Sequence, residues 1–433
     1  MHAPVLSRWL IPRLPFFYGW VILGCVCCAG LSRQGGAVAT LSIFVAPMTQ
    51  EFGWSRTAIS GAVSLGGVLA ALVSPFLGRL LDRDGARKVL CLAILATGLA
   101  NLSLSLTVAL PMFYVLFCIA RMNFAGPFDL GIYGAVNNWF VARRGFANAL
   151  ATIGQMVGLV TLPLVAQFAM LGGDWRTGWL AVGGTVLVVG FIPVFLLMVR
   201  RPEDVGLVPD RTEVRGNADA PAATPVAEPT FTRAEALRTA SFWLLTLFTL
   251  FAYPVQAGVS LHQAPFLIER GLTPTMAATV VSTFSLMSGA ASMVFGLVSR
   301  RVAVRHRLAA VGLLMMAGAL ALRFVHDAPT GYVSAAIFGV GIGGLLTMLP
   351  IAWADYYGRR SYGAIRGLAL SVQVLAQAAG PLISGVLRDL TGTYDLSLLC
   401  FAILAGISAL AALLARPPVP RQPVVVDRPL PRR

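Results

Sequence analysis

The sequence carries little charge for its length. Only 12% of its 433 residues are Asp, Glu, Lys or Arg, whereas ordinary soluble domains carry about 25%. Acidic residues are scarcer than basic residues, with 18 Asp and Glu against 33 Lys and Arg, and there are only four histidines. Together with 57% hydrophobic residues, this composition argues against a cytosolic enzyme and indicates a chain that lies in a membrane.

Cysteine is also scarce, and none is placed where a loop disulfide would form. All six cysteines lie inside apolar runs, where free thiols behave as small hydrophobic side chains. The segment "CVCC" (25–28) has no further metal-ligand residue nearby, so we expect no metal and no cofactor. We also find no nucleophile–base set and no phosphate-binding loop, and we therefore do not expect an enzyme.

Long apolar runs recur along the whole chain. Each is long enough to cross a hydrocarbon core of ~30 Å as a helix. The twelve runs have the approximate limits 17–45, 57–77, 89–110, 112–136, 148–170, 178–199, 241–264, 277–298, 308–326, 331–353, 367–387 and 396–415. The sequence therefore predicts an all-α membrane protein with twelve transmembrane helices.

The basic residues are distributed unevenly. The net charge is +15, and with the N-terminus inside, most Lys and Arg fall in alternate segments that face inward. Arg33 and Arg121 are assigned to the interior of spans, and the remaining Lys and Arg lie on or near the outward side. A bias of this kind sets the orientation during insertion, so both termini are expected in the cytoplasm. The basic residues form no clustered face, and we expect no nucleic-acid partner.

A segment rich in Pro, Ala and charge divides the chain. "VPDRTEVRGNADAPAATPVAEPT" (208–230) has no apolar periodicity and predicts a flexible cytoplasmic linker. Just after it, Thr232 and Glu235 have the spacing of a capping box, which predicts a short helix before the seventh span. The predicted organisation is a six-helix bundle at 1–200, the linker at 201–240, a second six-helix bundle at 241–416 and a disordered cytoplasmic tail at 417–433.

The two halves resemble each other at a nearly constant offset. "PMTQEFGWSRTA" (47–58) matches "PFLIERGLTPTM" (265–276) at positions 218 residues apart, and the same offset relates Gly78 to Gly296. "RGFANALATIGQMVG" (144–158) matches "RGLALSVQVLAQAAG" (366–380) at an offset of 222. The matched pairs of this second block include Arg144/Arg366, Gly145/Gly367, Gln155/Gln377 and Gly158/Gly380. We predict two pseudo-symmetric bundles that arose by duplication, with a ligand site at their interface near the membrane midplane.

The loop "GRLLDRDGARK" (78–88) joins the second and third spans. It resembles the cytoplasmic loop motif of the major facilitator superfamily, and the matching residues are Gly78, Asp82, Arg83, Gly85 and Arg87. The resemblance implies two six-helix bundles that alternate in access to a central site, with this loop as a conformational latch. Glycines permit a tight turn, and Asp82 can pair with an arginine or accept hydrogen bonds at a helix N-terminus. The alternative is a solvated charge cluster.

Further segments narrow the resemblance. "EFGWSRTAIS" (51–60), "NNWFVARRGFANAL" (137–150) and "YYGRRSYGAIRGLALS" (356–371) are similar to bacterial members related to the monocarboxylate and oxalate–formate transporters. Such relatives commonly place cationic residues in the eighth span, and some also in the eleventh. Both spans are predicted to lack charge here, so a carboxylate would be held mainly by the N-terminal half, or the substrate would not be a simple acid.

Ionisable and amide side chains within the spans are the candidates for a site. The candidates for substrate binding are Arg33, Arg121, His262, Gln155 and Gln377. Two guanidiniums can hold a carboxylate through paired hydrogen bonds and stay charged at physiological pH. Asp129 is the candidate proton carrier, and it follows Arg121 by just over two helical turns, on roughly the same face. The alternatives are structural ion pairing, snorkelling to the interface, a gate contact or hydrogen bonds between helices.

The predicted function is secondary transport of a small organic anion, with a monocarboxylate as the leading candidate, by proton symport or anion exchange. The expected partners are this substrate, protons or a counter-anion, and the lipid bilayer. The resemblance implies a multi-pass protein of the bacterial inner membrane, and we expect a monomer. The alternatives are an efflux pump for a hydrophobic or amphipathic compound and a non-transporting membrane sensor. Import, export and uniport stay open.

Overall fold

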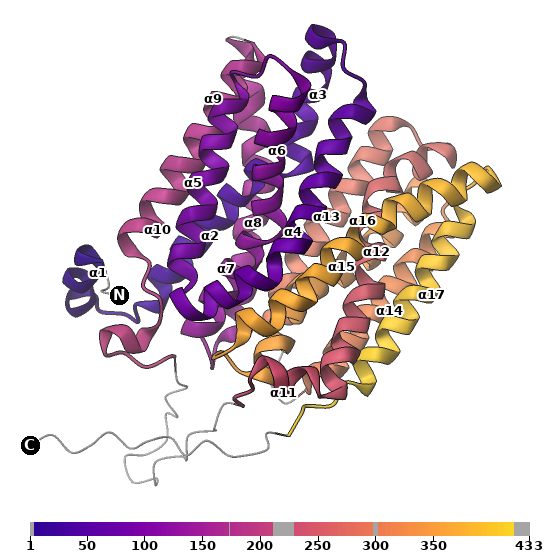
Figure 1. Ribbon diagram of the computed structural model, residues 1–433. Helices are drawn as coiled ribbons and strands as arrows, with labels where there is room; N and C mark the ends of the chain where they lie inside the picture. The colour runs from indigo at the N-terminus through magenta and orange to yellow at the C-terminus, as the bar shows by residue number, and fades with distance from the viewer. Residues whose placement is uncertain (1–3, 173, 211–228, 298–301, 420–433) are drawn as a thin grey trace, which may run out of the picture.

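The computed structural model describes residues 4–172, 174–210, 229–297 and 302–419. Within these ranges, twelve helical segments are long and apolar enough to cross a membrane, and each overlaps one predicted run. They form two bundles of six, one drawn in indigo to magenta and the other in orange to yellow (Figure 1). The prediction of an all-α protein with twelve spans in two pseudo-symmetric bundles is confirmed.

Three of the six spans in the first bundle are interrupted helices. The uninterrupted spans are α4 (Arg56–Asp84), α5 (Ala86–Leu104) and α8 (Arg144–Leu171). The interrupted spans are α2 (Gly19–Arg33) with a 3₁₀ turn (Gln34–Gly36) and α3 (Val38–Phe52); α6 (Leu110–Ala125) with α7 (Pro127–Trp139); and α9 (Trp175–Thr185) with a π-helical turn (Val186–Phe191) and α10 (Ile192–Leu197). Because proline lacks an N–H, the Gly126–Pro127 step ends one helix and suits the first position of the next.

Each span of the second bundle is one continuous helix. The six helices are α12 (Ala240–Glu269), α13 (Pro274–Leu297), α14 (Val304–Arg323), α15 (Ala328–Tyr357), α16 (Tyr362–Thr391) and α17 (Asp395–Leu414). Three of these helices, α12, α15 and α16, contain internal prolines, which packed transmembrane helices tolerate because neighbouring groups satisfy the freed backbone. The two bundles therefore share a plan but differ in where the backbone is broken.

The bundles meet along two helix pairs that the internal repeat relates. α4 packs against α16, and α8 packs against α13. In the first pair Gly78 lies against Gly363 and Gly367, and in the second Gly145 lies against Gly296. A Cβ atom at any of them would overlap the partner backbone, so glycine permits this approach. The repeat matched Gly78 with Gly296 and Gly145 with Gly367, and these are the positions where the bundles touch.

Polar contacts also cross between the bundles at the end of the molecule that carries the linker, called here the linker side (Figure 1). Arg144 Nη1 lies 2.5 Å from Asp355 Oδ1, and Arg359 Nη2 lies 2.6 Å from Glu203 Oε1. Each pair joins a residue of the first half to one of the second half. The bundles are therefore closed against each other on the linker side.

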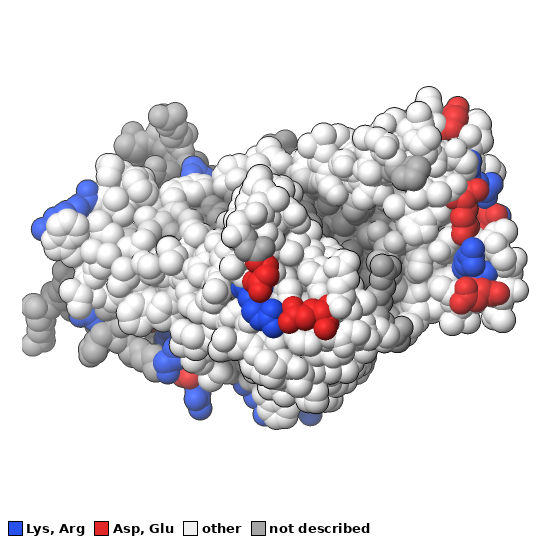
Figure 2. All heavy atoms as spheres, turned by 90° about the horizontal axis from the view of Figure 1, so that it is seen from above, with Lys and Arg blue, Asp and Glu red and all other residues white. Residues whose placement is uncertain are grey.

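The opposite end, called here the open side, is arranged differently. The ion pairs Glu51–Arg176, at 2.6 Å, and Glu269–Arg388, at 2.9 Å, each stay within one bundle. Figure 1 shows the bundles diverging toward this end, and the view from above shows a recess between them (Figure 2). A solute can therefore reach the space between the bundles from the open side.

The short helix predicted by the capping box is present. α11 (Arg233–Leu237) begins after Thr232, whose hydroxyl accepts from the Glu235 N–H while the Glu235 carboxylate accepts from the Thr232 N–H. The flexible linker and the disordered tail were predicted over 201–240 and 417–433. Residues 211–228 and 420–433 of these predictions lie outside the described residues.

Candidate functional site

The breaks in the first and fourth spans place opposite charges at helix ends near the centre of the first bundle. Arg33 is the last residue of α2, and Asp129 lies in the first turn of α7. A cation at a helix C-terminus and an anion at a helix N-terminus are both stabilised by the helix dipole. The interrupted backbone therefore lowers the cost of holding these two charges within the membrane.

Arg33 is held by three neighbours. Its Nε donates to the Phe124 carbonyl oxygen at 2.9 Å, its Nη1 donates to Gln155 Oε1, and its Nη2 lies 3.7 Å from Asp129 Oδ2. The guanidinium also lies 4.5 Å from the centroid of the Phe124 ring. These contacts fix its direction, and its side chain keeps 14% exposure toward the space between the bundles.

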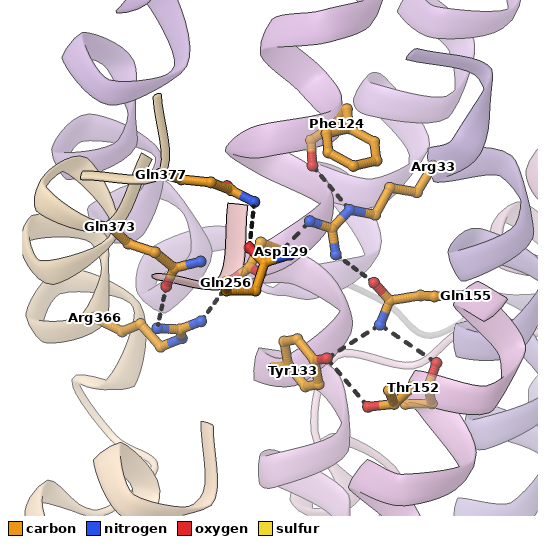
Figure 3. A network of polar contacts seen from close by, with 11 residues as sticks. Arg33, Phe124, Asp129, Tyr133, Thr152, Gln155, Gln256, Arg366, Gln373 and Gln377 are labelled. Atoms are coloured by element: carbon orange, nitrogen blue, oxygen red, sulfur yellow. Dashed lines mark hydrogen bonds and ion pairs between the residues drawn. The ribbon is translucent and has the colours of Figure 1, made fainter. Parts of the chain in front are cut away.

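Asp129 links the two bundles. Its Oδ1 accepts a hydrogen bond of 2.7 Å from Arg366 Nη2 of α16, in the second bundle. Figure 3 shows Arg33 and Arg366 approaching Asp129 from its two sides. The Arg366 side chain is 1% exposed and that of Asp129 is 6% exposed. The three side chains form a buried array of two positive charges and one negative charge.

Arg366 corrects the prediction that the eleventh span is uncharged. That span was drawn from residue 367, but α16 begins at Tyr362 and carries Arg366 inside the helix. The apolar window ended just short of the arginine because a charged residue lowers the average hydropathy of any window that contains it. The internal repeat held the signal, since it matches Arg366 with Arg144, and both arginines pair with an aspartate of the other bundle.

A chain of hydrogen bonds supports Arg33 from within the first bundle. Gln155 Nε2 donates to Tyr133 Oη at 3.2 Å and to the Ala151 carbonyl oxygen at 3.4 Å. Tyr133 Oη lies 3.3 Å from Thr152 Oγ1. Both polar atoms of the Gln155 amide are thus engaged. Gln155, a predicted substrate-binding residue, lines the pocket and holds Arg33 in place.

The second bundle supplies amides. Gln377 Nε2 donates to Gln256 Oε1 at 3.0 Å, which joins α16 to α12. Gln373 Oε1 lies 3.5 Å from Arg366 Nη1. Figure 3 shows the three glutamines on the side of Asp129 opposite to Gln155. Of these three, Gln377 was predicted as a site residue, whereas Gln256 and Gln373 were missed.

These side chains surround one cavity of about 210 Å³ between the bundles. Eleven of its eighteen lining residues have polar or charged side chains. The polar lining consists of Arg33, Gln34, Asp129, Tyr133, Thr152, Gln155, Tyr253, Gln256, Arg366, Gln373 and Gln377. We call this cavity the central pocket. It fits the predicted position of a ligand site at the interface of the two halves.

Two predicted site residues are not among the described residues that line the central pocket. Arg121 Nη1 lies 3.4 Å from the Gly36 carbonyl oxygen, and its guanidinium lies 4.6 Å from the Phe124 ring centroid. The expectation that Arg121 and Asp129 share a helix face assumed one continuous helix, whereas one helix ends at Ala125 and another begins at Pro127. Arg121 supports the broken first span and the ring that Arg33 contacts.

His262 is the other predicted residue outside the central pocket. Its Nδ1 lies 3.2 Å from Tyr394 Oη, and its Nε2 lies 3.2 Å from the Pro381 carbonyl oxygen. It lines a separate cavity of about 10 Å³ within the second bundle, which is about the space of one water molecule. The structure thus ties His262 to contacts between α12, α16 and the start of α17.

The predicted latch residues divide into two groups. The Asp82 carboxylate accepts from the backbone N–H of Gly363 at 2.8 Å and of Ala364 at 2.7 Å, at the N-terminus of α16. Asp82 was predicted to pair with an arginine or with a helix N-terminus, and in the structure its partner is the helix N-terminus. Gly78 contacts the same turn of α16, so both residues join the bundles on the linker side.

The other latch residues act within the first bundle. Gly85 has a φ of +87°, a conformation that favours glycine, and forms the turn between α4 and α5. Arg83 Nε lies 3.2 Å from Asp84 Oδ1, and Arg87 Nη2 donates to the Phe195 carbonyl oxygen at 2.7 Å. These three residues shape the turn that follows Asp82 at the end of α4.

A family model and several relatives match nearly the full chain. The model described as Major Facilitator Superfamily matches residues 22–268 and 258–432. Monocarboxylate transporter 12 of Rattus norvegicus is 25% identical over 93% of this chain and 88% of its own. The probable sulfoacetate transporter SauU of Cupriavidus necator is 25% identical over 82% and 85%, and the membrane sensor protein UhpC of Salmonella typhimurium is 27% identical over 80% and 82%.

Solved structures match the fold. The proton:xylose symporter XylE, bound to 6-bromo-6-deoxy-D-glucose, has a TM-score of 0.69 at 12% identity and covers 91% of this chain and 94% of its own. FucP in the outward conformation has a TM-score of 0.69 at 14% identity, with 94% and 99% covered. At these identities the likeness concerns the arrangement of helices alone.

Proposed function

Because the chain belongs to the major facilitator superfamily, we propose that it is a secondary transporter that carries a small organic monocarboxylate by alternating access. The family and the fold are those of multi-pass membrane transporters. The predicted uneven distribution of Lys and Arg supports a cytoplasmic position for the linker side and for both termini, and we assign the protein to the bacterial inner membrane. Transport would then begin from a state open to the outside.

The observation that carries this proposal is the array of Arg33, Asp129 and Arg366 in the central pocket. Its formal charge is one positive charge, which a single carboxylate would neutralise. Each guanidinium presents several N–H donors in a plane, which suits the two oxygens of a carboxylate. Two relatives, named as a monocarboxylate transporter and a probable sulfoacetate transporter, support an anionic substrate.

The composition of the pocket favours an anion over the predicted alternative of a hydrophobic efflux substrate. Eleven of eighteen lining residues are polar or charged. An apolar compound would bury these groups without giving them hydrogen bonds, and that costs free energy for each unpaired group. The pocket therefore fits a small polar anion better.

Asp129 gives this site a route to proton coupling. While the carboxylate is ionised, it occupies the donors of Arg366 and attracts those of Arg33. A proton on Asp129 would release both guanidiniums for the substrate, so that substrate and proton would bind together. For anion exchange, the substrate carboxylate would instead displace Asp129 directly.

Opening the linker side would require the contacts between the bundles to separate. They include the Asp129–Arg366 pair, the Arg144–Asp355 pair and the hydrogen bonds of Asp82 to the α16 N-terminus. Because Asp129–Arg366 is both a contact between bundles and part of the proposed site, binding there would weaken one of the bonds that hold the linker side closed. This links substrate binding to the conformational change.

Counterflow in proteoliposomes tests the proposal. Purified protein loaded with an unlabelled monocarboxylate should exchange it for the labelled acid, across a panel of short-chain acids and with and without a pH gradient. Arg33→Ala and Arg366→Ala should each lower the exchange at least tenfold. Arg388→Ala is the matched control, because Arg388 lies on the same helix as Arg366 but pairs with Glu269 on the open side. Absence of exchange for every acid would contradict the proposal.

A sensor that binds without transporting is the second candidate, because one relative is named a membrane sensor protein. In that case the purified protein would bind an acid, seen as a rise in its thermal unfolding temperature, yet would show no counterflow. Binding together with counterflow would exclude this second candidate.

A further inference from the structure

The two sides of the central pocket differ in how many of their polar groups already have partners. On the side of the first bundle, Gln155 donates to Tyr133 and accepts from Arg33, and Tyr133 also contacts Thr152. These groups satisfy one another and hold Arg33 in position. Beyond the Arg33 guanidinium, the Gln34 amide is the group on this side that lines the pocket without a side-chain partner among the described residues.

The side of the second bundle keeps unused capacity. The hydrogen bond from Gln377 Nε2 to Gln256 Oε1 fixes both amides against each other. Among the described residues, Gln256 Nε2 and Gln377 Oε1 have no hydrogen-bond partner, although both side chains line the pocket. Gln373 uses its Oε1 toward Arg366, and its Nε2 likewise has no partner in the described part of the chain. The paired amides thus keep one donor group and one acceptor atom without a partner among the described residues.

We propose that the substrate is a hydroxylated monocarboxylate, whose carboxylate binds Arg33 and Arg366 and whose hydroxyl groups bind Gln256 and Gln377. This inference rests on the proposed function and narrows its substrate class. A hydroxyl group both donates and accepts, so one hydroxyl matches the Gln256 donor and the Gln377 acceptor together. A plain alkyl chain would cover the same amides and leave them unpaired, and sites of this kind discriminate strongly against analogues that lack the hydroxyl.

Size and position agree with this class. The pocket of about 210 Å³ is many times the space that one water molecule needs, enough for an acid of a few carbons with its hydroxyl groups. Figure 3 shows the Gln256–Gln377 pair beside Asp129, next to the guanidiniums that would hold the carboxylate. A hydroxyl near the carboxyl end of the molecule would therefore reach the amides.

The first test compares acids that differ only in hydroxylation. Propionate, lactate and glycerate have the same carbon skeleton with no, one and two hydroxyl groups, and each can be measured by counterflow in proteoliposomes of the full chain. The expected kcat/KM for lactate or glycerate is at least tenfold that for propionate. Equal values, or a preference for propionate, would overturn the inference while leaving the proposed transport of a monocarboxylate standing. If none of the panel of acids is exchanged, the proposed function and this inference both fail.

The second test assigns the preference to the two amides. Gln256→Leu and Gln377→Leu should each reduce the ratio of glycerate to propionate kcat/KM at least fivefold. Gln263→Leu is the control, because Gln263 lies two turns farther along α12 and lines the separate small cavity; its ratio should match that of the original protein. An unchanged ratio in both pocket variants, with normal size-exclusion profiles, would overturn the assignment.

Discussion

Replacing Asp129 with asparagine is expected to tighten anion binding. Asp129 is the carboxylate that already contacts both guanidiniums, with Oδ1 2.7 Å from Arg366 and Oδ2 3.7 Å from Arg33. A substrate carboxylate must displace it before the same donors are available. Asparagine keeps the size of the side chain but has no charge, so in Asp129→Asn the substrate meets a weaker competitor.

The magnitude follows from the contact that the substrate displaces. A hydrogen bond to a charged group contributes about 1.5–3 kcal/mol. Only the Arg366 contact has hydrogen-bond length, because the Arg33 contact of 3.7 Å exceeds the usual range. Losing this bond entirely would lower the Kd about 10- to 150-fold, since each 1.4 kcal/mol is a factor of about ten. Because the asparagine oxygen can still accept from Arg366, this range is the upper limit of the expected decrease.

Isothermal titration of the purified protein with lactate measures the effect. Asp355→Asn is the matched control: it also removes an aspartate that pairs with an arginine of the other bundle, at 2.5 Å, but Asp355 is not among the described residues that line the central pocket. If Asp355→Asn tightened lactate binding equally, the effect would come from loosened contacts between the bundles and not from the loss of a competing carboxylate. Weaker or unchanged binding in Asp129→Asn would refute the competition argument.

Two further predictions concern the linker side. Asp82→Asn removes the charge from two hydrogen bonds to the α16 N-terminus, each worth about 1.5–3 kcal/mol. The distances between spin labels at the linker-side ends of α4 and α16 should therefore lengthen. Asp84→Asn is the control and should leave these distances unchanged, because the Asp84 carboxylate pairs within its own bundle. Gly145→Val would overlap the Gly296 backbone at a cost of about 1–3 kcal/mol, so the distance between α8 and α13 should lengthen and counterflow should slow. Gly172→Val is its control, because nothing lies within 4 Å of a Cβ there, and shorter distances in either test variant would contradict the reasoning.

The parts of the fold that depend on hydropathy and duplication were predictable from the sequence. Twelve apolar runs gave the spans, because a helix in a bilayer must satisfy its own backbone and must be long enough to cross. The repeat also identified contact residues: Gly78, Gly145, Gly296 and Gly367 were matched by sequence, and they lie where the bundles touch. Closely packed helices require small residues at their contacts, and this requirement leaves a pattern in the sequence.

The geometry of the site was less accessible. Arg33 and Asp129 were found because a charge within an apolar run is conspicuous, but Arg121 was expected beside them on a continuous helix. The break at Gly126–Pro127 interrupts the helix between Arg121 and Asp129, and a hydropathy pattern does not report such a break. Arg366 was missed because it lies in the second turn of α16, where a window average places the edge of the span.

The two pairs between the bundles explain why only one of the duplicated arginines belongs to the central pocket. Arg144 and Arg366 are matched by the repeat at an offset of 222, but their partners Asp355 and Asp129 are 226 residues apart. The extra four residues amount to about one helical turn, or ~6 Å, and they place Asp129 nearer the open side than Asp355. The repeat mate of Asp355 is Tyr133, which lines the central pocket. A shift of one turn in the acidic partner thus leaves Arg144 in a contact that closes the linker side, whereas Arg366 is drawn toward Arg33, where the two guanidiniums can bind one carboxylate.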